Sequence, residues 1–327
     1  MIQSLRLLIP ALALVVVALI PVFAPTTQVL LTLALAKSLA VLGVIVLLQA
    51  GQVSFGHALY FAVAAYTATF VGKVMSGGEI VVTLLAGAVA AGTVSVVVGL
   101  FVTRYRHIFF GMLNLAVSMI FFSFLEKFYF VTGGSDGLSV ARPTVIGLSL
   151  ERGPFEAVLF YGSLGLVAAA LFLTDRFLHS SIGQMMRAIK TNEVRLEYLG
   201  ISARHVLLIG YVVSAVLCGL GGALMATAQG IVTPEYAWWI RSGEFVFIAI
   251  LGGAGSIGGA VAGALIYESV RTYAAAFAAD IWQMVLGFIL LVIILFAPKG
   301  IMGIFQGLQP RAGSSRTRGG TKVEPAE

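Results

Sequence analysis

Long apolar runs dominate this sequence and restrict its fold. Stretches of the ~20 residues that a helix needs to cross a bilayer lie at about 7–24, 29–50, 80–102, 108–131, 157–175, 206–229 and 280–297. Two further regions, 51–72 and 242–277, are apolar but interrupted by glycine. Because 59% of the residues are hydrophobic and only 10% are charged, a soluble fold could not bury them. We therefore expect an all-α polytopic membrane protein with about 8–10 transmembrane helices.

The basic residues predict which loops face the cytoplasm. If Arg6 lies inside, successive crossings place Arg104 and Arg106 inside, residues 131–155 outside and residues 176–205 inside, as the positive-inside rule expects. The basic tail ends inside only if residues 230–298 cross an odd number of times. A half-helix at about 242–252, a return helix at 257–277 and a final span at 280–297 satisfy this count. Region 242–260 is therefore expected to be re-entrant.

Other features of the whole sequence restrict the class of protein and its domain organisation. The positive charges lie at the ends of apolar spans rather than on one face, which argues against nucleic-acid binding. The single Cys218 lies in an apolar run and cannot form an intrachain disulfide. Residues 5–24 resemble a signal peptide superficially, but their length favours a retained helix. We expect a transmembrane domain at 1–309 and a disordered cytoplasmic tail at 310–327, which has no apolar face to bury.

The longest polar segment between apolar runs is residues 175–205. The spacing of Ile182, Met185, Met186 and Ile189 places them on one face of a short amphipathic helix, with Arg187 and Lys190 elsewhere. Asn192 can cap a second short helix, in which Glu193 lies at the positive N-terminal end. Gly200 offers a left-handed stop. The segment is predicted to be a cytoplasmic helix-turn-helix that a partner binds.

The two glycine-broken regions share a pattern at a constant offset of 202 residues. The first is Gly51-x-x-Ser54-x-Gly56-x-Ala58, and the second is Gly253-x-x-Ser256-x-Gly258-x-Ala260. The small residues could simply permit close helix packing. Alternatively, paired interruptions can mark a translocation path in a protein with an internal two-fold repeat. We favour the path, with Gln52 and His57 beside it, although a lone His is more often structural than a proton relay.

Charged and aromatic residues near the spans also allow two interpretations. Lys37 lies inside an apolar run and either snorkels to the interface or faces protein. Glu268 and Arg271 can neutralise each other at i and i+3, so we favour a structural pair over a gate. Tyr236, Trp238 and Trp239 are expected to be interfacial anchors at the outer edge.

Four motifs resemble the permease subunits of branched-chain amino-acid ABC importers. They are the Gly51 to Ala58 signature followed by Phe61 and Ala65-Tyr66-Thr67; the segment with Arg187-Ala188-Ile189, Asn192-Glu193 and Leu199-Gly200-Ile201; the glycine-rich Ile250 to Gly259; and Ala297-Pro298-Lys299-Gly300-Ile301. The resemblance covers about residues 30–305. The loop at Thr132-Gly133-Gly134 is more similar to the larger, M-type permease of the pair.

The resemblance implies a multi-pass protein of the bacterial inner membrane that forms a path with a second permease. Two ABC ATPases and an extracytoplasmic solute-binding protein would complete the importer. The ATPase-coupling residues would be Met185, Met186, Arg187, Ile189, Asn192, Glu193 and Gly200, with the apolar ones buried in a groove of the ATPase. Branched-chain amino acids are the expected solute, with other amino acids, amides or urea as alternatives.

The sequence lacks motifs for chemistry of its own. It contains no GxxxxGK[ST] phosphate loop, HExxH or CxxC, so we expect a subunit that is not an enzyme and needs no cofactor. The glycines at 252–258 resemble a dinucleotide loop but lack a βαβ context. The main rival is a stand-alone secondary transporter, which would need an intramembrane coupling site. A membrane-embedded enzyme is a weaker third option.

Overall fold

The computed structural model describes residues 14–21, 23–75, 78–145, 147–277, 282–296 and 300–307. The predicted tail at 310–327 lies outside the described residues. Residues 14–21 are helical. The long helices that follow are α2 (Gln28–Gln49), α3 (His57–Val74), α4 (Ile80–Val102), α5 (His107–Lys127), α7 (Arg152–His179), α8 (Ser181–Tyr198), α9 (Ala203–Gln229), α10 (Trp239–Gly252), α11 (Ile257–Phe277) and α12 (Trp282–Phe296).

Short elements join these helices. They are η1 (Pro25–Thr27), α6 (Tyr129–Thr132), η2 (Gly134–Asp136), β1 (Leu138–Ser139), β2 (Ile231–Val232), η3 (Pro234–Ala237) and α13 (Gly300–Gly307). β1 and β2 form a two-residue antiparallel pair, in which Leu138 lies opposite Val232. The expectation of an all-α polytopic membrane protein is confirmed, with this small pair as a local exception.

Helix length and composition identify the candidate spans. Among the described residues, α2, α4, α5, α7 and α9 are long and apolar enough to cross a membrane, and the bent pair α10 and α11 makes a sixth if it counts as one span. The expected 8–10 helices are therefore not reached on this criterion. α3 begins in the first glycine-broken region and α12 has 15 residues. The internal two-fold repeat stays a prediction.

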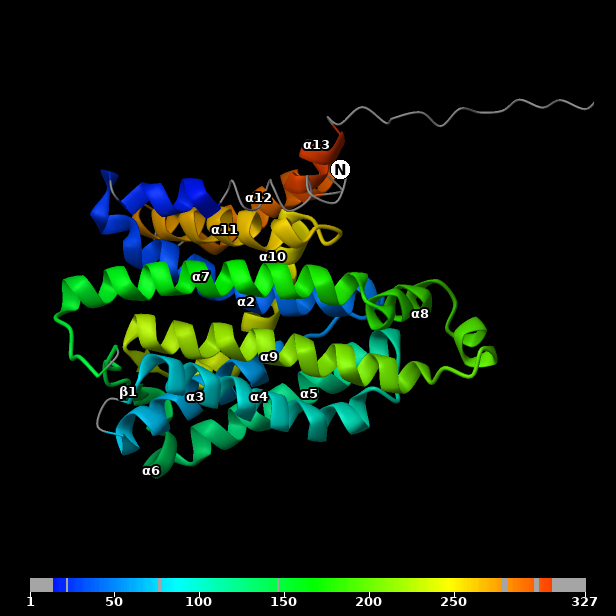
Figure 1. Ribbon diagram of the computed structural model, residues 1–327, viewed down its shortest axis with the longest axis horizontal. Coiled ribbons are helices and arrows are strands. Elements are labelled where there is room, and N and C mark those ends of the chain that lie inside the picture. Colours follow the sequence, from blue (N-terminus) through cyan, green and yellow to red (C-terminus); the bar gives the residue numbers. More distant parts are fainter. Residues whose placement is uncertain are drawn as a thin grey trace, which may run out of the picture.

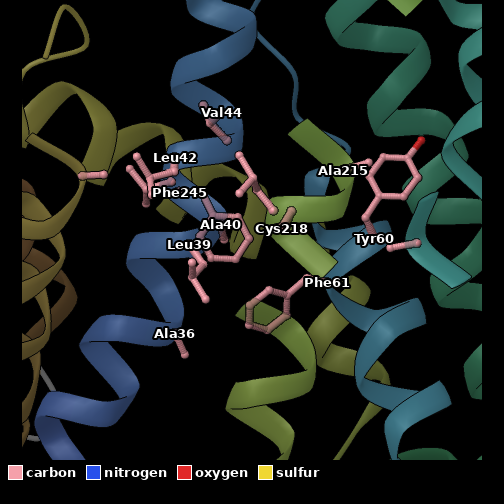
Figure 2. Packing of buried hydrophobic residues seen from close by; sticks show 14 of the residues in the cluster. Ala36, Leu39, Ala40, Leu42, Val44, Tyr60, Phe61, Ala215, Cys218 and Phe245 are labelled. Atoms are coloured by element: carbon pink, nitrogen blue, oxygen red, sulfur yellow. The ribbon is translucent and has the colours of Figure 1, made fainter. Parts of the chain in front are cut away.

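The core is built around α9. This helix packs against α2, α3 and α4, and its small residues permit close approach. A Cβ added at Gly222 would lie 2.0 Å from the carbonyl oxygen of Phe61, and one at Gly221 would lie 2.5 Å from that of Ala36. Figure 2 shows the resulting apolar core, where Phe245 of α10 meets α2 and Cys218 of α9 lies between α2 and α3.

The bundle has two distinct ends (Figure 1). α8 lies at one end, and β1 and α6 lie at the other. The pairing of β1 with β2, together with hydrogen bonds between Gly78 and Thr144, joins the predicted outer loop to the segments that follow α9 and α3. Arg106 reaches α8 at the opposite end. This arrangement agrees with the predicted separation of residues 131–155 from residues 104–106 and 176–205.

The predicted break near residue 253 is present. The chain bends by 113° between α10 and α11 across a short turn, and these helices correspond to the expected half-helix and return helix. A further irregular segment, residues 230–238, was not expected. It includes β2 and η3, and Ser118 of α5 donates a hydrogen bond to the Ala237 carbonyl at 2.9 Å.

Candidate functional site at the α8 end

The local structure of α8 follows the polar segment's sequence. Asn192 leaves helical geometry (φ −163°, ψ 100°) and kinks α8. Its Oδ1 accepts a hydrogen bond from the Arg195 N–H at 3.0 Å, which caps the second half of the helix. Gly200 has φ +80°, the left-handed conformation that glycine adopts without penalty. Both predicted features, the Asn192 cap and the Gly200 stop, are confirmed.

The apolar face of α8 packs against its own chain. Met186 and Ile189 are buried, and Met185 is half-buried. A Cβ added at Gly210 of α9 would lie 2.5 Å from the Met186 Cε, so this side chain fills the space beside that glycine. The expectation that a partner's groove buries Met186 and Ile189 is therefore wrong, because α9 and its neighbours already cover this face.

The second half of α8 presents a different surface. Val194, Tyr198 and Leu199 are 58%, 87% and 72% exposed, respectively. We call these three residues the α8 tip. Large apolar side chains clustered at a helix end are common at protein interfaces. Arg187 is half-buried, whereas Asn192 and Gly200 are exposed.

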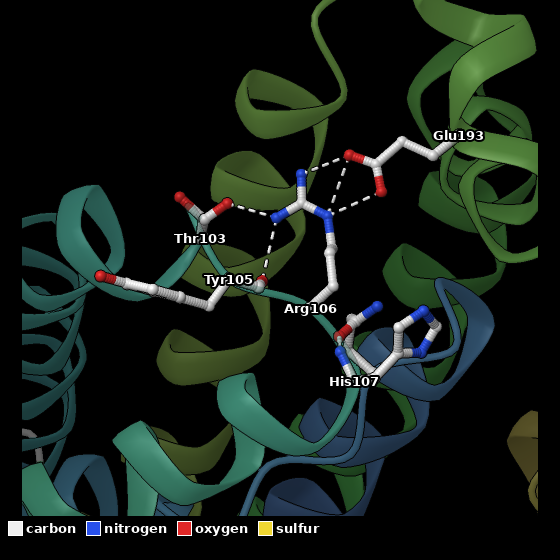
Figure 3. A network of polar contacts seen from close by, with 6 residues as sticks. Thr103, Tyr105, Arg106, His107 and Glu193 are labelled. Carbon is white, nitrogen blue, oxygen red and sulfur yellow. Dashed lines mark hydrogen bonds and ion pairs between the residues drawn. The ribbon is translucent and has the colours of Figure 1, made fainter.

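Glu193 forms an ion pair within its own chain. Its carboxylate accepts hydrogen bonds from the guanidinium of Arg106, with Nε at 2.8 and 3.0 Å and Nη2 at 2.7 Å (Figure 3). Arg106 Nη1 also donates to the carbonyl oxygens of Thr103 at 2.5 Å and Tyr105 at 3.0 Å. A forked pair of this kind is directional. It ties α8 to the loop between α4 and α5.

The first glycine break lies directly beside this network. Gly51 has φ +73°, and a Cβ there would come within 3.0 Å of the Lys190 Cγ on α8. The buried Gln52 side chain accepts a hydrogen bond from the backbone N–H of His107 at 2.8 Å. His107 has φ +53°, a strained value for a residue other than glycine. Gly51 thus contacts α8 itself, and Gln52 contacts the residue that follows Arg106.

The other residues of the first break pack and form hydrogen bonds inside the bundle. The backbone at Gly56 touches Asn114, since a Cβ there would lie 2.4 Å from the Asn114 carbonyl oxygen. His57 lies at hydrogen-bond distance, 2.5 Å, from the Ser214 hydroxyl, which donates to the Gly43 carbonyl at 2.6 Å. Ser54 and His57 are buried. The structural interpretation of His57 therefore has a partner, on α9, that sequence spacing could not identify.

The second break meets the first. Gly253 has φ +106°, Gly258 is buried and Ser256 is half-buried. The Gln49 amide at the end of α2 donates to the Ala254 carbonyl at 3.3 Å. Whether the two breaks line a path for solute stays a prediction, but they share one end of the bundle.

A buried ion cluster joins α2, α10 and α11. Lys37 is fully buried; its Nζ lies 2.6 Å from Glu268 Oε2 and also pairs with Glu244. Arg241 Nη1 lies 3.1 Å from Glu244, and Arg271 Nη1 lies 3.8 Å from Glu268. Lys37 thus faces protein, and the predicted pairing of Glu268 with Arg271 is present. Sequence reasoning missed Glu244 and Arg241, whose i and i+3 spacing was the available signal.

Only some of the aromatic residues predicted to be interfacial anchors are exposed. Trp239 is 41% exposed, but Tyr236 is buried against Phe61 and 5.6 Å from the Arg241 guanidinium. The anchor expectation for Tyr236 is therefore wrong, because the irregular segment 230–238 turns it into the bundle. In the part of the chain that the structure describes, no three His, Cys, Asp or Glu side chains gather as a metal site would require.

These features define a multi-pass helical membrane protein with a capped, kinked helix at one end and two helix breaks beside it. The family model of the branched-chain amino acid transport system permease component matches residues 26–295. The chain belongs to this family, and it is a multi-pass protein of the inner membrane.

Individual relatives agree with this assignment. The chain is 26% identical over 273 residues to the high-affinity branched-chain amino acid transport system permease protein LivM of Escherichia coli (strain K12), covering 77% of this chain and 64% of LivM. It is 30% identical over 136 residues to LivH of Salmonella typhimurium, covering 41% of this chain and 44% of that relative. The longer match to LivM confirms the resemblance to the M-type permease. The chain spans just under two thirds of the length of LivM.

Proposed function

We propose that this chain is a permease subunit of an ATP-driven importer and forms, with a second permease, the path for a small polar solute. Branched-chain amino acids are the favoured solute, because the relatives LivM and LivH are named as permeases of branched-chain amino acid transport systems. The subunit would not catalyse any reaction; two ABC ATPases would hydrolyse ATP, and an extracytoplasmic binding protein would deliver the solute.

The observation that carries this proposal is the α8 tip. A chain without a phosphate loop must receive the energy of ATP-driven transport from another protein. Val194, Tyr198 and Leu199 offer an exposed apolar contact at the end of the bundle where the positive-inside rule places the cytoplasm. The contact surface for the ATPase is therefore this tip, whereas Met186 and Ile189 support the helix from within.

The first experiment measures uptake of radiolabelled L-leucine in cells that lack the gene, with and without plasmid-borne wild-type chain. The proposal expects the wild-type chain to restore uptake and expects ATP depletion to abolish it. Purified chain in vesicles, without any ATPase, should transport no leucine. Leucine accumulation by these vesicles in a proton or sodium gradient would instead establish the secondary transporter.

The second experiment tests the docking surface with matched leucines. Leu199 and Leu148 are both exposed, at 72% and 66%, but lie at opposite ends of the bundle. Leu199→Glu should weaken ATPase co-purification about tenfold, since the loss of an anchor residue at an interface costs about 1–2 kcal/mol, and should lower uptake. Leu148→Glu should leave ATPase co-purification unchanged. Equal co-purification in the two variants would remove the α8 tip as the contact.

A further inference from the structure

Two neighbouring contacts join α8 to the first glycine break by way of the α4–α5 loop. Arg106 holds the Glu193 carboxylate, and the next residue, His107, donates its backbone N–H to Gln52. Figure 3 shows Arg106, the last residue of the loop, beside His107, the first residue of α5, with Glu193 above them on α8. A displacement of Glu193 would therefore reach Gln52 across one peptide unit.

The connection is stiff at each step. The Arg106 guanidinium is held by the carbonyls of Thr103 and Tyr105 as well as by Glu193, so it cannot follow Glu193 without moving the loop. His107 sits in a left-handed conformation that few side chains adopt, and such strain persists only where the surroundings enforce it. Gln52 is buried and cannot swing away. The loop thus behaves as a spacer of fixed length between α8 and the break.

A second contact acts on the adjacent residue. Gly51 packs against Lys190, which lies on α8 three residues before Glu193. Beyond Gln52, the break has little freedom: a Cβ at Gly111 would lie 3.1 Å from the Val53 carbonyl oxygen, and Gly56 touches the Asn114 backbone. A shift imposed at residues 51 and 52 would consequently pass along the break to the start of α3.

We infer that Arg106 and Gln52 are positioning residues that transmit a displacement of α8 to residues 51–57 and so to α3. This inference rests on the proposed function of α8 as the segment that an ATPase moves. It assigns a role in solute transport to two residues through their contacts within the chain. The first break is then the part of the proposed solute path that moves when α8 moves.

The direct test uses a thiol at Val53, which is 36% exposed, in the full chain in native membranes; the natural Cys218 is buried. The labelling rate of Val53→Cys with a maleimide reports the mobility of the break. Arg106→Gln and Glu193→Gln should each raise this rate at least threefold. The double variant should match the singles, because both remove the same link. Arg152→Gln, which breaks the exposed Arg152–Glu156 pair of α7, should leave the rate unchanged.

Glu193→Gln is the control for misfolding of the loop, because it leaves the contacts of Arg106 with the carbonyls of Thr103 and Tyr105 in place. Labelling rates that are unaffected by both single variants, or that add in the double variant, would overturn the inference. Such additivity would mean that the two side chains act on the break independently.

Uptake separates transmission from a merely structural role. Arg106→Gln and Gln52→Leu should reduce leucine uptake at least fivefold while the amount of chain in the membrane and the co-purified ATPase stay at wild-type levels. Parallel loss of uptake, membrane level and partners would identify a structural tie only and overturn the inference. If the wild-type chain itself restores no leucine uptake, the proposed function fails, whereas the labelling experiment still decides whether α8 and the break are coupled.

Discussion

Replacing Lys37 by methionine tests the buried ion cluster. Methionine keeps an unbranched apolar side chain, one heavy atom shorter than that of lysine, and removes the positive charge between Glu244 and Glu268. Glu244 keeps Arg241 at 3.1 Å, while Glu268 is left with Arg271 at 3.8 Å. Removing one partner of a buried pair typically costs about 3–5 kcal/mol. Because each carboxylate retains one cation, we expect a loss of about 3 kcal/mol, roughly a hundredfold in the unfolding equilibrium.

The assay is a detergent titration of the purified full chain in mixed micelles. Unfolding is followed by tryptophan fluorescence, since Trp238 and Trp239 lie where α10 begins. Lys73→Met is the matched control: Lys73 is exposed in the last turn of α3, so its loss should change the free energy of unfolding by less than about 0.5 kcal/mol. Adding Glu268→Gln to Lys37→Met should recover at least half of the loss. A Lys37→Met variant within about 1 kcal/mol of wild type would refute the reasoning.

Three further predictions address backbone and hydroxyl contacts. Gly222→Ala should cost about 1–3 kcal/mol in the same titration, because its Cβ would lie 2.0 Å from the Phe61 carbonyl oxygen, whereas Gly162→Ala, with open space around it, should be neutral. Ser214→Ala should cost about 1–3 kcal/mol, since it leaves buried polar groups unpaired; an unchanged midpoint would contradict this. Gly200→Ala should cost about 1–2 kcal/mol through its positive φ alone, and hydrogen exchange at the end of α8 should rise.

Local features of α8 could be predicted from the sequence because their physics is local. A cap needs only Asn192 and the N–H three residues later, and a left-handed stop needs only Gly200. Periodicity also identified the apolar face that contains Met186 and Ile189. It could not say what covers this face, because a helix repeat is the same whether a partner or the helix's own bundle lies against it.

Contacts between distant segments could not be predicted in the same way. His57 and Ser214 are 157 residues apart, and Lys37 and Glu244 are 207 apart, so no spacing rule relates them. The paired glycine motifs were found by their constant offset, but their meeting through Gln49 and Ala254 depends on the fold. The irregular segment 230–238 was missed because its apolar and aromatic residues resemble an interfacial anchor when read without their packing.

The contacts of α2 determine which part of the bundle can respond to α8. Its middle is fixed to α10 and α11 by Lys37, and Gly43 is fixed to α9 by Ser214. These ties leave the non-helical residues after α2 as the connection between a held helix and α3. A push from α8 at Gly51 and Gln52 would therefore be carried to the start of α3, where His57 meets Ser214. The ion cluster thus anchors the middle of α2, while the helix break follows its C-terminal end, beside α8.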